Sequence, residues 1–330
     1  MSPRPLAREP SPGLVWSWEE ALFGAACALP AALVALGDPG RGIALSVGVL
    51  PAVIVGVLPR RRARPLVAVV GATTGVSMLI GGLLAGVPVL AVAAIWGLGV
   101  GAALLAARSP LGRVAMVLAL PMVGVGLSYS DLGEAAGLAA LMALGSIYAC
   151  LVSLLWPQGE PRPAGRETVA PSLDYGVRLG AAGALAAALG FVLGLQHVGW
   201  APAAALLVMR PAAEMQRARS IGRLLAVALG ATLAVLMVHL EPANAWFALA
   251  ALLAIAAAAA THRSRWYVTP AFTTFLVFLM LLHSDPGDSR FRFNERLLET
   301  ALGVAIAYFF GLLLPALRAR RGSGGGAARR

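Results

Sequence analysis

The chain has 330 residues, of which 59% are hydrophobic and 12% are charged, about half the charged fraction of a typical soluble domain. Mean hydropathy is +0.81, and the 26 basic residues are all arginines that stand in short clusters between apolar runs. This composition excludes a soluble enzyme. The net charge of +11 does not form the basic face of a soluble nucleic-acid-binding fold. The sequence therefore indicates an integral membrane protein whose main partner is the lipid bilayer.

Twelve apolar runs approach the length of about 20 residues that a transmembrane helix needs. The first six fall at 18–37, 42–58, 65–85, 88–107, 112–128 and 135–156. After a polar cytoplasmic linker, the other six fall at 174–194, 196–210, 220–239, 243–260, 266–283 and 297–316. The eighth run is short, which fits a tilted or partly re-entrant segment. We expect an all-α polytopic protein of about 12 transmembrane helices, flanked by a cytoplasmic segment at 1–17 and a disordered cytoplasmic tail at 317–330.

The arginines also predict an orientation. With a cytoplasmic N-terminus and twelve crossings, 22 of the 26 arginines lie on the inner side. Only Arg41, Arg290, Arg292 and Arg296 lie on the outer side. Cytoplasmic loops of membrane proteins carry such an excess of basic residues. The absence of lysine beside abundant Ala, Gly and Arg is typical of a GC-rich bacterial genome. We therefore expect a multi-pass protein of a bacterial inner membrane with both ends in the cytoplasm.

Three pairs of short matches indicate an internal duplication. Their offsets are 156, 159 and 158 residues, and they pair Gly24–Leu33 with Gly180–Leu189, Gly71–Thr73 with Gly230–Thr232, and Ala143–Gly145 with Ala301–Gly303. A near-constant offset across three pairs carries more weight than any single match between Ala-rich helices. Because each unit would hold six helices, both units would have the same orientation in the membrane. We expect two parallel six-helix repeats at 18–156 and 174–316, joined by a linker at 157–173, with a substrate path between them.

Four segments of the second half carry a resemblance to a known family. They are Gly199–Pro202 leading to Arg210–Pro211, Arg223–Gly230, Tyr267–Thr274 and Arg296–Gly303. In this order the segments resemble the fusaric acid resistance (FUSC) family of the aromatic acid exporter superfamily, over roughly 174–316. The first half resembles it more weakly. Ala226 and Val227 stand where the family usually has Gly and Thr, and the short linker replaces a soluble domain that many members carry.

The resemblance implies proton-driven export of small organic acids, often aromatic ones, across the inner membrane. Two other functions stay open. One is an anion channel, as in the plant aluminium-activated malate transporters of the same superfamily, and the other is a non-transporting envelope membrane protein.

Candidate substrate-binding residues follow from the chemistry of an organic anion. Arg210 and Arg223 abut apolar runs, and a planar guanidinium suits a carboxylate, although positive-inside topology also explains them. Trp200 and Tyr267 could stack on an aromatic substrate or belong to the interfacial aromatic belt. Thr274, in the Thr-containing segment of the resemblance, completes this set.

Candidate proton-coupling or gating residues are the ionisable groups near the ends of two apolar runs. Glu299 and Arg296 share a helix face, since they are three residues apart. They form either a gated, proton-exchanging pair or an interfacial anchor. His239, beside Glu241, is either a proton relay or an ordinary interfacial residue.

No residue set predicts catalysis, a metal site or a cofactor. Cys27 and Cys150 lie in apolar runs, and the four histidines lack ligand-like spacing. There is no nucleotide-binding loop that would make the chain an ATP-driven pump on its own. We expect no enzyme activity, no metal, no cofactor and no nucleic-acid partner. The sequence leaves open whether the chain forms a homo-oligomer.

Overall fold

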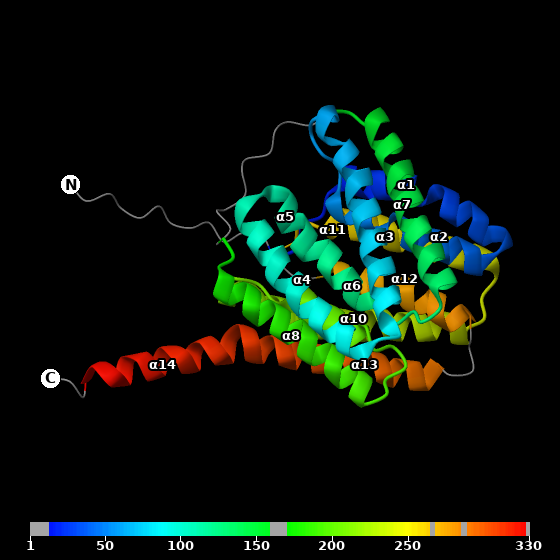
Figure 1. The fold of residues 1–330 in the computed structure, drawn as a ribbon. Helices are drawn as coiled ribbons and strands as arrows, with labels where there is room; N and C mark the ends of the chain where they lie inside the picture. The colour runs from blue at the N-terminus through cyan, green and yellow to red at the C-terminus, as the bar shows by residue number, and fades with distance from the viewer. Residues whose placement is uncertain (1–12, 159–169, 265–267, 285–288, 328–330) are drawn as a thin grey trace, which may run out of the picture.

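The computed structural model describes residues 13–158, 170–264, 268–284 and 289–327. Every regular element in these ranges is helical, which confirms the predicted all-α class (Figure 1).

The first half contains seven α-helices: α1 (Trp18–Gly37), α2 (Pro39–Val55), α3 (Pro65–Ala85), α4 (Pro88–Arg108), α5 (Pro110–Val114), α6 (Leu120–Gly126) and α7 (Leu132–Leu155). A short 3-10 turn, Arg61–Ala63, precedes α3, and a π-helical segment, Ala115–Ala119, joins α5 to α6. Proline, whose missing N–H is no loss at a helix start, occupies the first position of α2, α3, α4 and α5.

The second half contains α8 (Leu173–Val192), α9 (Trp200–Val208), α10 (Ala213–His239), α11 (Asn244–Thr261), α12 (Thr269–Ser284), α13 (Ser289–Tyr308) and α14 (Leu314–Ala327). A second π-helical segment, Phe309–Leu313, joins α13 to α14. In Figure 1, α14 continues from α13 and extends away from the rest of the bundle. The predicted disordered tail at 317–330 therefore differs from the structure, in which the helix continues through Ala327. Arg318 donates a hydrogen bond to Asp174 on α8 at 2.8 Å, which holds the first turn of α14 in place.

Eight helices in the described part of the chain are long and apolar enough to cross a membrane. Three further apolar segments, Pro39–Val55, Pro110–Gly126 and Thr269–His283, are shorter. The predicted eighth span differs most, because α9 has only nine residues. Such a helix rises about 14 Å, less than half of a hydrocarbon core about 30 Å thick. The structure thus supports a multi-pass helical membrane protein, while the count of twelve crossings stays a prediction.

The outer surface of the bundle fits this class. Large apolar side chains such as Leu22, Val89, Leu155 and Leu225 are exposed on it. Soluble monomers rarely expose so much apolar surface, whereas a lipid environment requires it.

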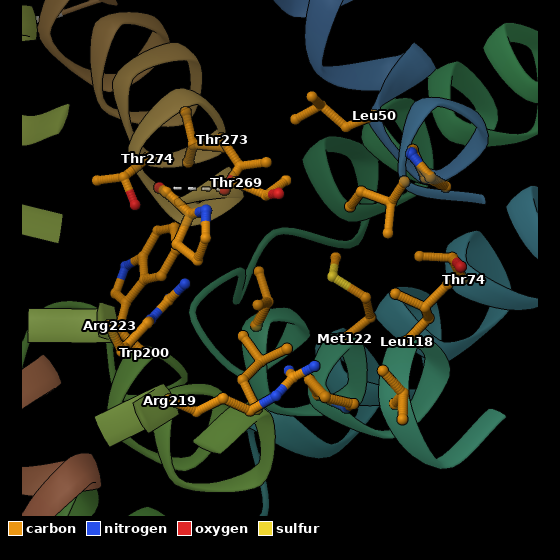
Figure 2. A pocket seen from close by; sticks show the side chains of 18 of the residues that line it. Leu50, Thr74, Leu118, Met122, Trp200, Arg219, Arg223, Thr269, Thr273 and Thr274 are labelled. Carbon is orange, nitrogen blue, oxygen red and sulfur yellow. Dashed lines mark hydrogen bonds between the residues drawn. The ribbon is translucent and has the colours of Figure 1, made fainter. Parts of the chain in front are cut away.

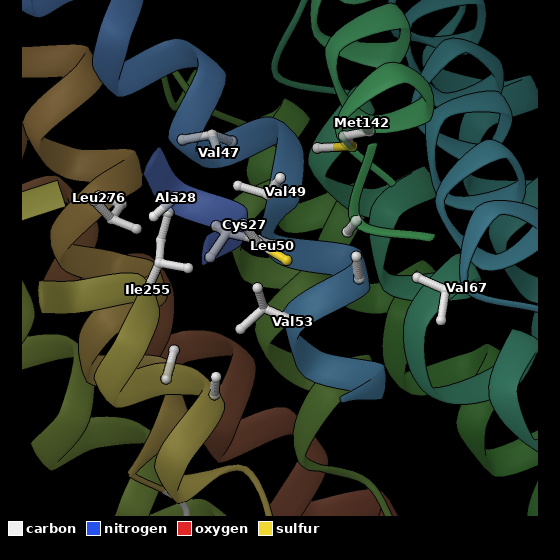
Figure 3. Packing of buried hydrophobic residues seen from close by; sticks show 14 of the residues in the cluster. Cys27, Ala28, Val47, Val49, Leu50, Val53, Val67, Met142, Ile255 and Leu276 are labelled. Atoms are coloured by element: carbon white, nitrogen blue, oxygen red, sulfur yellow. The ribbon is translucent and has the colours of Figure 1, made fainter. Parts of the chain in front are cut away.

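The two halves pack against each other through α1 with α11 and through α4 with α8, which are among the most extensive helix pairs. Each pair has a close contact at a glycine. A Cβ atom at Gly24 of α1 would lie 2.7 Å from the Cβ of Ala259, and one at Gly180 of α8 would overlap the carbonyl oxygen of Trp96. Small residues allow such close backbone contact between membrane helices. Figure 3 shows the apolar core beside the first pair, where Cys27 and Ala28 of α1 pack near Ile255 and Leu276.

Arg64 differs in role from its neighbours Arg60, Arg61 and Arg62. The sequence predicts only that all four arginines help to set the orientation of the protein in the membrane. Its side chain is fully buried, whereas Arg62 is exposed. The Arg64 guanidinium donates to the carbonyl oxygens of Ser153, of Trp156 at 2.8 Å, of Pro157 at 2.7 Å and of Leu58 at 3.0 Å. A cation at a helix C-terminus satisfies carbonyls that have no partner within the helix. Arg64 therefore fastens the C-terminal end of α7 to the start of α3.

Candidate functional site

A cavity of about 560 Å³ lies between the two halves of the chain, and we call it the central cavity. Four helices of the first half line it, namely α2, α3, α6 and α7, with the π-helical segment before α6. Four helices of the second half, α9, α10, α12 and α13, line the other side. Its volume falls in the range of about 300–1,000 Å³ that is usual for small-molecule sites.

The central cavity is open at one end and closed at the other. The open end, which we call the mouth, lies at the start of α10, where Glu214 and Met215 are exposed, and at the turn after α11, where Ser264 is half-buried. At the closed end, Trp200 and Arg296 are each only 5% exposed. A molecule that enters at the mouth therefore moves toward buried, positively charged groups.

The wall from the second half is polar and carries the cations. Arg223 of α10 and Arg296 of α13 line it and are both buried. Thr274 of α12 also lines it, and its Oγ1 atom is buried without a hydrogen-bond partner among the described residues. Figure 2 shows Trp200 and Arg223 on this side, with Thr274 nearby. This wall therefore offers one unused hydroxyl beside two buried guanidinium groups, and the half-buried Arg219 of α10 adds a third guanidinium.

The wall from the first half is almost entirely apolar. Leu50, Leu118, Met122 and Met142 line it, and in Figure 2 Leu118 and Met122 lie across the cavity from Trp200. Tyr129, between α6 and α7, adds a phenol that also lines the cavity. Burial raises the pKa of Tyr129 to about 12, so the phenol stays protonated and can donate a hydrogen bond to an anion. The cavity thus suits a molecule with an anionic group on one side and an apolar body on the other.

At the closed end, Arg296 rests on the face of Trp200. The Arg296 Cζ atom lies 3.4 Å from the centroid of the Trp200 ring, a cation–π geometry. Glu299, one turn further along α13, is only 1% exposed. Neither carboxylate oxygen of Glu299, nor Nη1 of Arg296, has a hydrogen-bond partner in the part of the chain that the structure describes. Arg296 and Glu299 are therefore buried and neighbouring, but they are not joined by a hydrogen bond.

The sequence-predicted residues divide into two groups. Trp200, Arg223, Thr274 and Arg296 all line the central cavity, although they come from four different helices, and Glu299 lies directly behind Arg296 in a second, smaller void. The buried position of Trp200 differs from that of an interfacial belt residue.

The remaining predicted residues lie elsewhere. Arg210 is buried at the end of α9, where it donates to the carbonyl oxygen of Met209, and it does not line the cavity. His239 is exposed at the C-terminal end of α10, away from the cavity. Tyr267 lies outside the described residues.

Sequence reasoning missed Glu295 and His197. Glu295 precedes the predicted twelfth span at 297–316, but α13 begins at Ser289, so Glu295 is inside the helix and only 7% exposed. Its carboxylate Oε2 lies 3.1 Å from Nδ1 of His197. The signal for Glu295 was present in the sequence, since it stands four residues before Glu299 and hence on the same helix face.

No arrangement in the described residues suggests metal chemistry. They contain no group of three or more His, Cys, Asp or Glu side chains that could hold a metal ion.

The apolar helical bundle, with a cavity between its halves, is typical of a multi-pass membrane protein. Residues 185–310 match the family model described as fusaric acid resistance protein-like. The match spans α9 to α13, which supply the polar wall of the cavity, together with the end of α8. No curated protein and no solved structure matches the chain.

Proposed function

We propose that this protein is a secondary transporter of the bacterial inner membrane that exports small organic acids, with a preference for carboxylates that carry an apolar or aromatic body. The observation that carries this proposal is the division of the central cavity into a cationic wall and an apolar wall. A carboxylate would bind Arg223 and Arg296, because guanidinium groups present paired donors to carboxylate oxygens. The apolar body would lie against Leu118 and Met122.

The charge balance of the cavity favours an anion over a neutral molecule. Arg296 is buried beside it, its Nη1 has no hydrogen-bond partner among the described residues, and burying a charged group is costly unless hydrogen bonds compensate it. The acidic residue at the mouth, Glu214, is exposed and therefore screened by solvent. An entering carboxylate would lower the electrostatic cost of burying Arg296, and this gain would favour its binding.

Equivalent contacts in the two halves support the proposed pair of parallel six-helix repeats. Gly24 and Gly180, which the proposed repeat aligns, each form a close contact of their helix with the other half. Gly145 and Gly303, also aligned, would each place a Cβ against backbone of the second helix of their own repeat, α2 and α9 respectively.

The third aligned pair behaves differently, because Gly71 faces α7 whereas Gly230 faces α12. The helices that line the cavity are nevertheless at equivalent positions of the two proposed repeats, which supports a cavity on the proposed axis between them.

The orientation expected from the arginines would place the mouth on the cytoplasmic side. The turns at the mouth belong to the predicted inner loops, together with Arg217 and Arg263. An organic acid would then enter from the cytoplasm, as export requires. Glu299, buried behind Arg296 without a hydrogen-bond partner among the described residues, is the carboxylate we propose for proton coupling.

The experiment that tests this function is transport into inside-out membrane vesicles. A panel of labelled aromatic and aliphatic carboxylates would be supplied with and without an imposed pH gradient. We expect accumulation of one class of carboxylate that an uncoupler abolishes. Arg223→Gln should reduce this uptake severely. Arg217→Gln, the same change at an exposed residue of α10 outside the cavity, should leave it nearly unchanged.

Three other results would contradict the proposal. Flux that runs only downhill and ignores the pH gradient would indicate an anion channel. An absence of flux for every acid, in vesicles shown to contain folded protein, would favour a non-transporting envelope protein. If Arg223→Gln and Arg217→Gln reduced uptake equally, the central cavity would not be part of the transport path.

A further inference from the structure

The closed end of the central cavity adjoins a second, much smaller void of about 10 Å³. Trp200 and Arg296 line both spaces, so these two side chains form the partition between them. The far side of the small void is lined by His197, Glu295 and Glu299. It is too small for an organic acid and has room for about one water molecule. The route from the mouth therefore continues past Trp200 and Arg296 but is shut at this point.

The turn between α8 and α9 covers the small void, and Glu295 of α13 holds it down. Glu295 Oε1 accepts a hydrogen bond from the backbone N–H of Gln196 at 2.7 Å. Its Oε2 lies 3.1 Å from Nδ1 of His197. Both oxygens of one buried carboxylate are thus used on two consecutive residues of this turn. We call Glu295, His197 and the Gln196 amide the latch.

The same turn is also fastened to the first half of the chain. The backbone N–H of Gly199 donates to Oγ of Ser128, just after α6, at 3.0 Å. A Cβ atom at Gly199 would overlap the carbonyl oxygen of Gly124, so the turn lies directly on the end of α6. Three residues beyond His197, the chain reaches Trp200, which begins α9. Any movement of the turn away from α13 would therefore carry Trp200 with it.

We propose that the latch is the exit gate of the transporter, and that release of Glu295 from the α8–α9 turn opens the closed end of the central cavity. This inference rests on the proposed transport function. Release frees the turn from α13, withdraws Trp200 from beneath the Arg296 guanidinium, and joins the small void to the central cavity. Glu295 acts by positioning the turn and has no contact with the substrate in the closed state.

Thiol labelling from each side of the membrane tests the gate without any substrate. Cys27 and Cys150 are both buried and would be replaced by alanine to remove background. Met122→Cys then places one thiol on the apolar wall, opposite Trp200. A membrane-impermeant thiol reagent is added to right-side-out and to inside-out vesicles, and the labelling rate is measured for each.

With the latch intact, we expect rapid labelling from one side of the membrane only. Glu295→Met keeps the side-chain length but removes both acceptors. It should raise the labelling rate from the other side about tenfold or more, since one hydrogen bond to a charged group changes an equilibrium by at least that factor. His197→Ala leaves the Gln196 contact in place and should give a smaller rise. Glu134→Met, the same change at an exposed residue one turn into α7, is the matched control and should have no effect.

The gate is refuted if Glu295→Met stays labelled from one side only while its labelling from the mouth side keeps the normal rate. If Glu295→Met loses mouth-side labelling because the protein is misfolded, His197→Ala decides by the same criterion. Rapid labelling of the intact latch from both sides would also overturn the proposal. Because no carboxylate is present, failure of the proposed substrate class would leave these outcomes unchanged, and the two failures can be told apart.

Discussion

Thr274 offers a sharp test of the anion site, because its hydroxyl has no hydrogen-bond partner among the described residues. The side chain is 2% exposed, lines the cavity, and leaves Oγ1 without a hydrogen bond among the described residues. Thr274→Val keeps the shape of the side chain and removes only this hydroxyl. The substitution should not lower stability, since an unpaired buried polar atom costs free energy. If the hydroxyl donates to the bound carboxylate, its loss should weaken affinity by about 1.5–3 kcal/mol, or roughly 10- to 140-fold.

The assay compares Thr274→Val with Thr74→Val in the same cavity. Thr74 is 4% exposed, but its hydroxyl already donates to the Val70 carbonyl oxygen at 2.7 Å. We expect Thr74→Val to change affinity little and to lower thermal stability slightly. Affinity would be measured by concentration dependence of vesicle uptake, and stability by thermal inactivation in detergent. Equal affinities for the two variants, or a clear loss of stability in Thr274→Val, would refute the assignment of this hydroxyl to the substrate.

Three further predictions concern helix packing, the Arg64 fastening and coupling. Gly180→Ala should lower stability by about 1–3 kcal/mol, because its Cβ would overlap the Trp96 carbonyl oxygen. Gly101→Ala, which faces open space on α4, should not lower it, and thermal inactivation compares the two. Arg64→Gln should cost about 3 kcal/mol by the same measurement, since one buried and three partly buried hydrogen bonds to carbonyl oxygens are lost, while the exposed Arg62→Gln should be neutral. Glu299→Gln should retain downhill flux but abolish accumulation driven by a pH gradient; full accumulation in this variant would remove Glu299 from coupling.

Apolar runs and proline at helix starts predicted the boundaries of the helices that are exposed to lipid. The predicted span 65–85 coincides with α3, and 88–107 differs from α4 by one residue, because proline and a long apolar run define both. The span predicted at 196–210 was too long, because residues 193–199 form the turn between α8 and α9. Hydrogen bonds from the backbone of this turn stabilise it, and hydropathy does not reveal them.

The start of α13 could not be predicted from hydropathy for a related reason. The polar residues between Ser289 and Arg296 are helical because Glu295 and Arg296 are buried against the α8–α9 turn and α9. A rule that starts a membrane helix at its first apolar residue therefore excludes them.

The candidate site was predictable only where a residue type is rare in apolar segments. Arg223, Arg296 and Trp200 stand out in this sequence, and all three line the cavity. Leu118 and Met122 do not, because Leu and Met are also common on lipid-facing and core surfaces. Sequence could thus indicate the cationic wall but not the apolar one. Arg210 shows the opposite error, since a buried arginine that caps a helix end resembles a ligand-binding arginine in sequence.

The division of the cavity walls between the two halves of the chain has a consequence for release. The arginines that would hold the carboxylate belong to one half, and most of the surface that would hold the apolar body belongs to the other. A rocking movement of one half against the other would pull the two attachment surfaces apart. The organic acid would then keep its contacts with at most one of the two walls. Its affinity for the protein would therefore fall as the central cavity opened to the outer side of the membrane. The same rocking movement that exposes the organic acid to the outer side of the membrane would also weaken its binding to the protein.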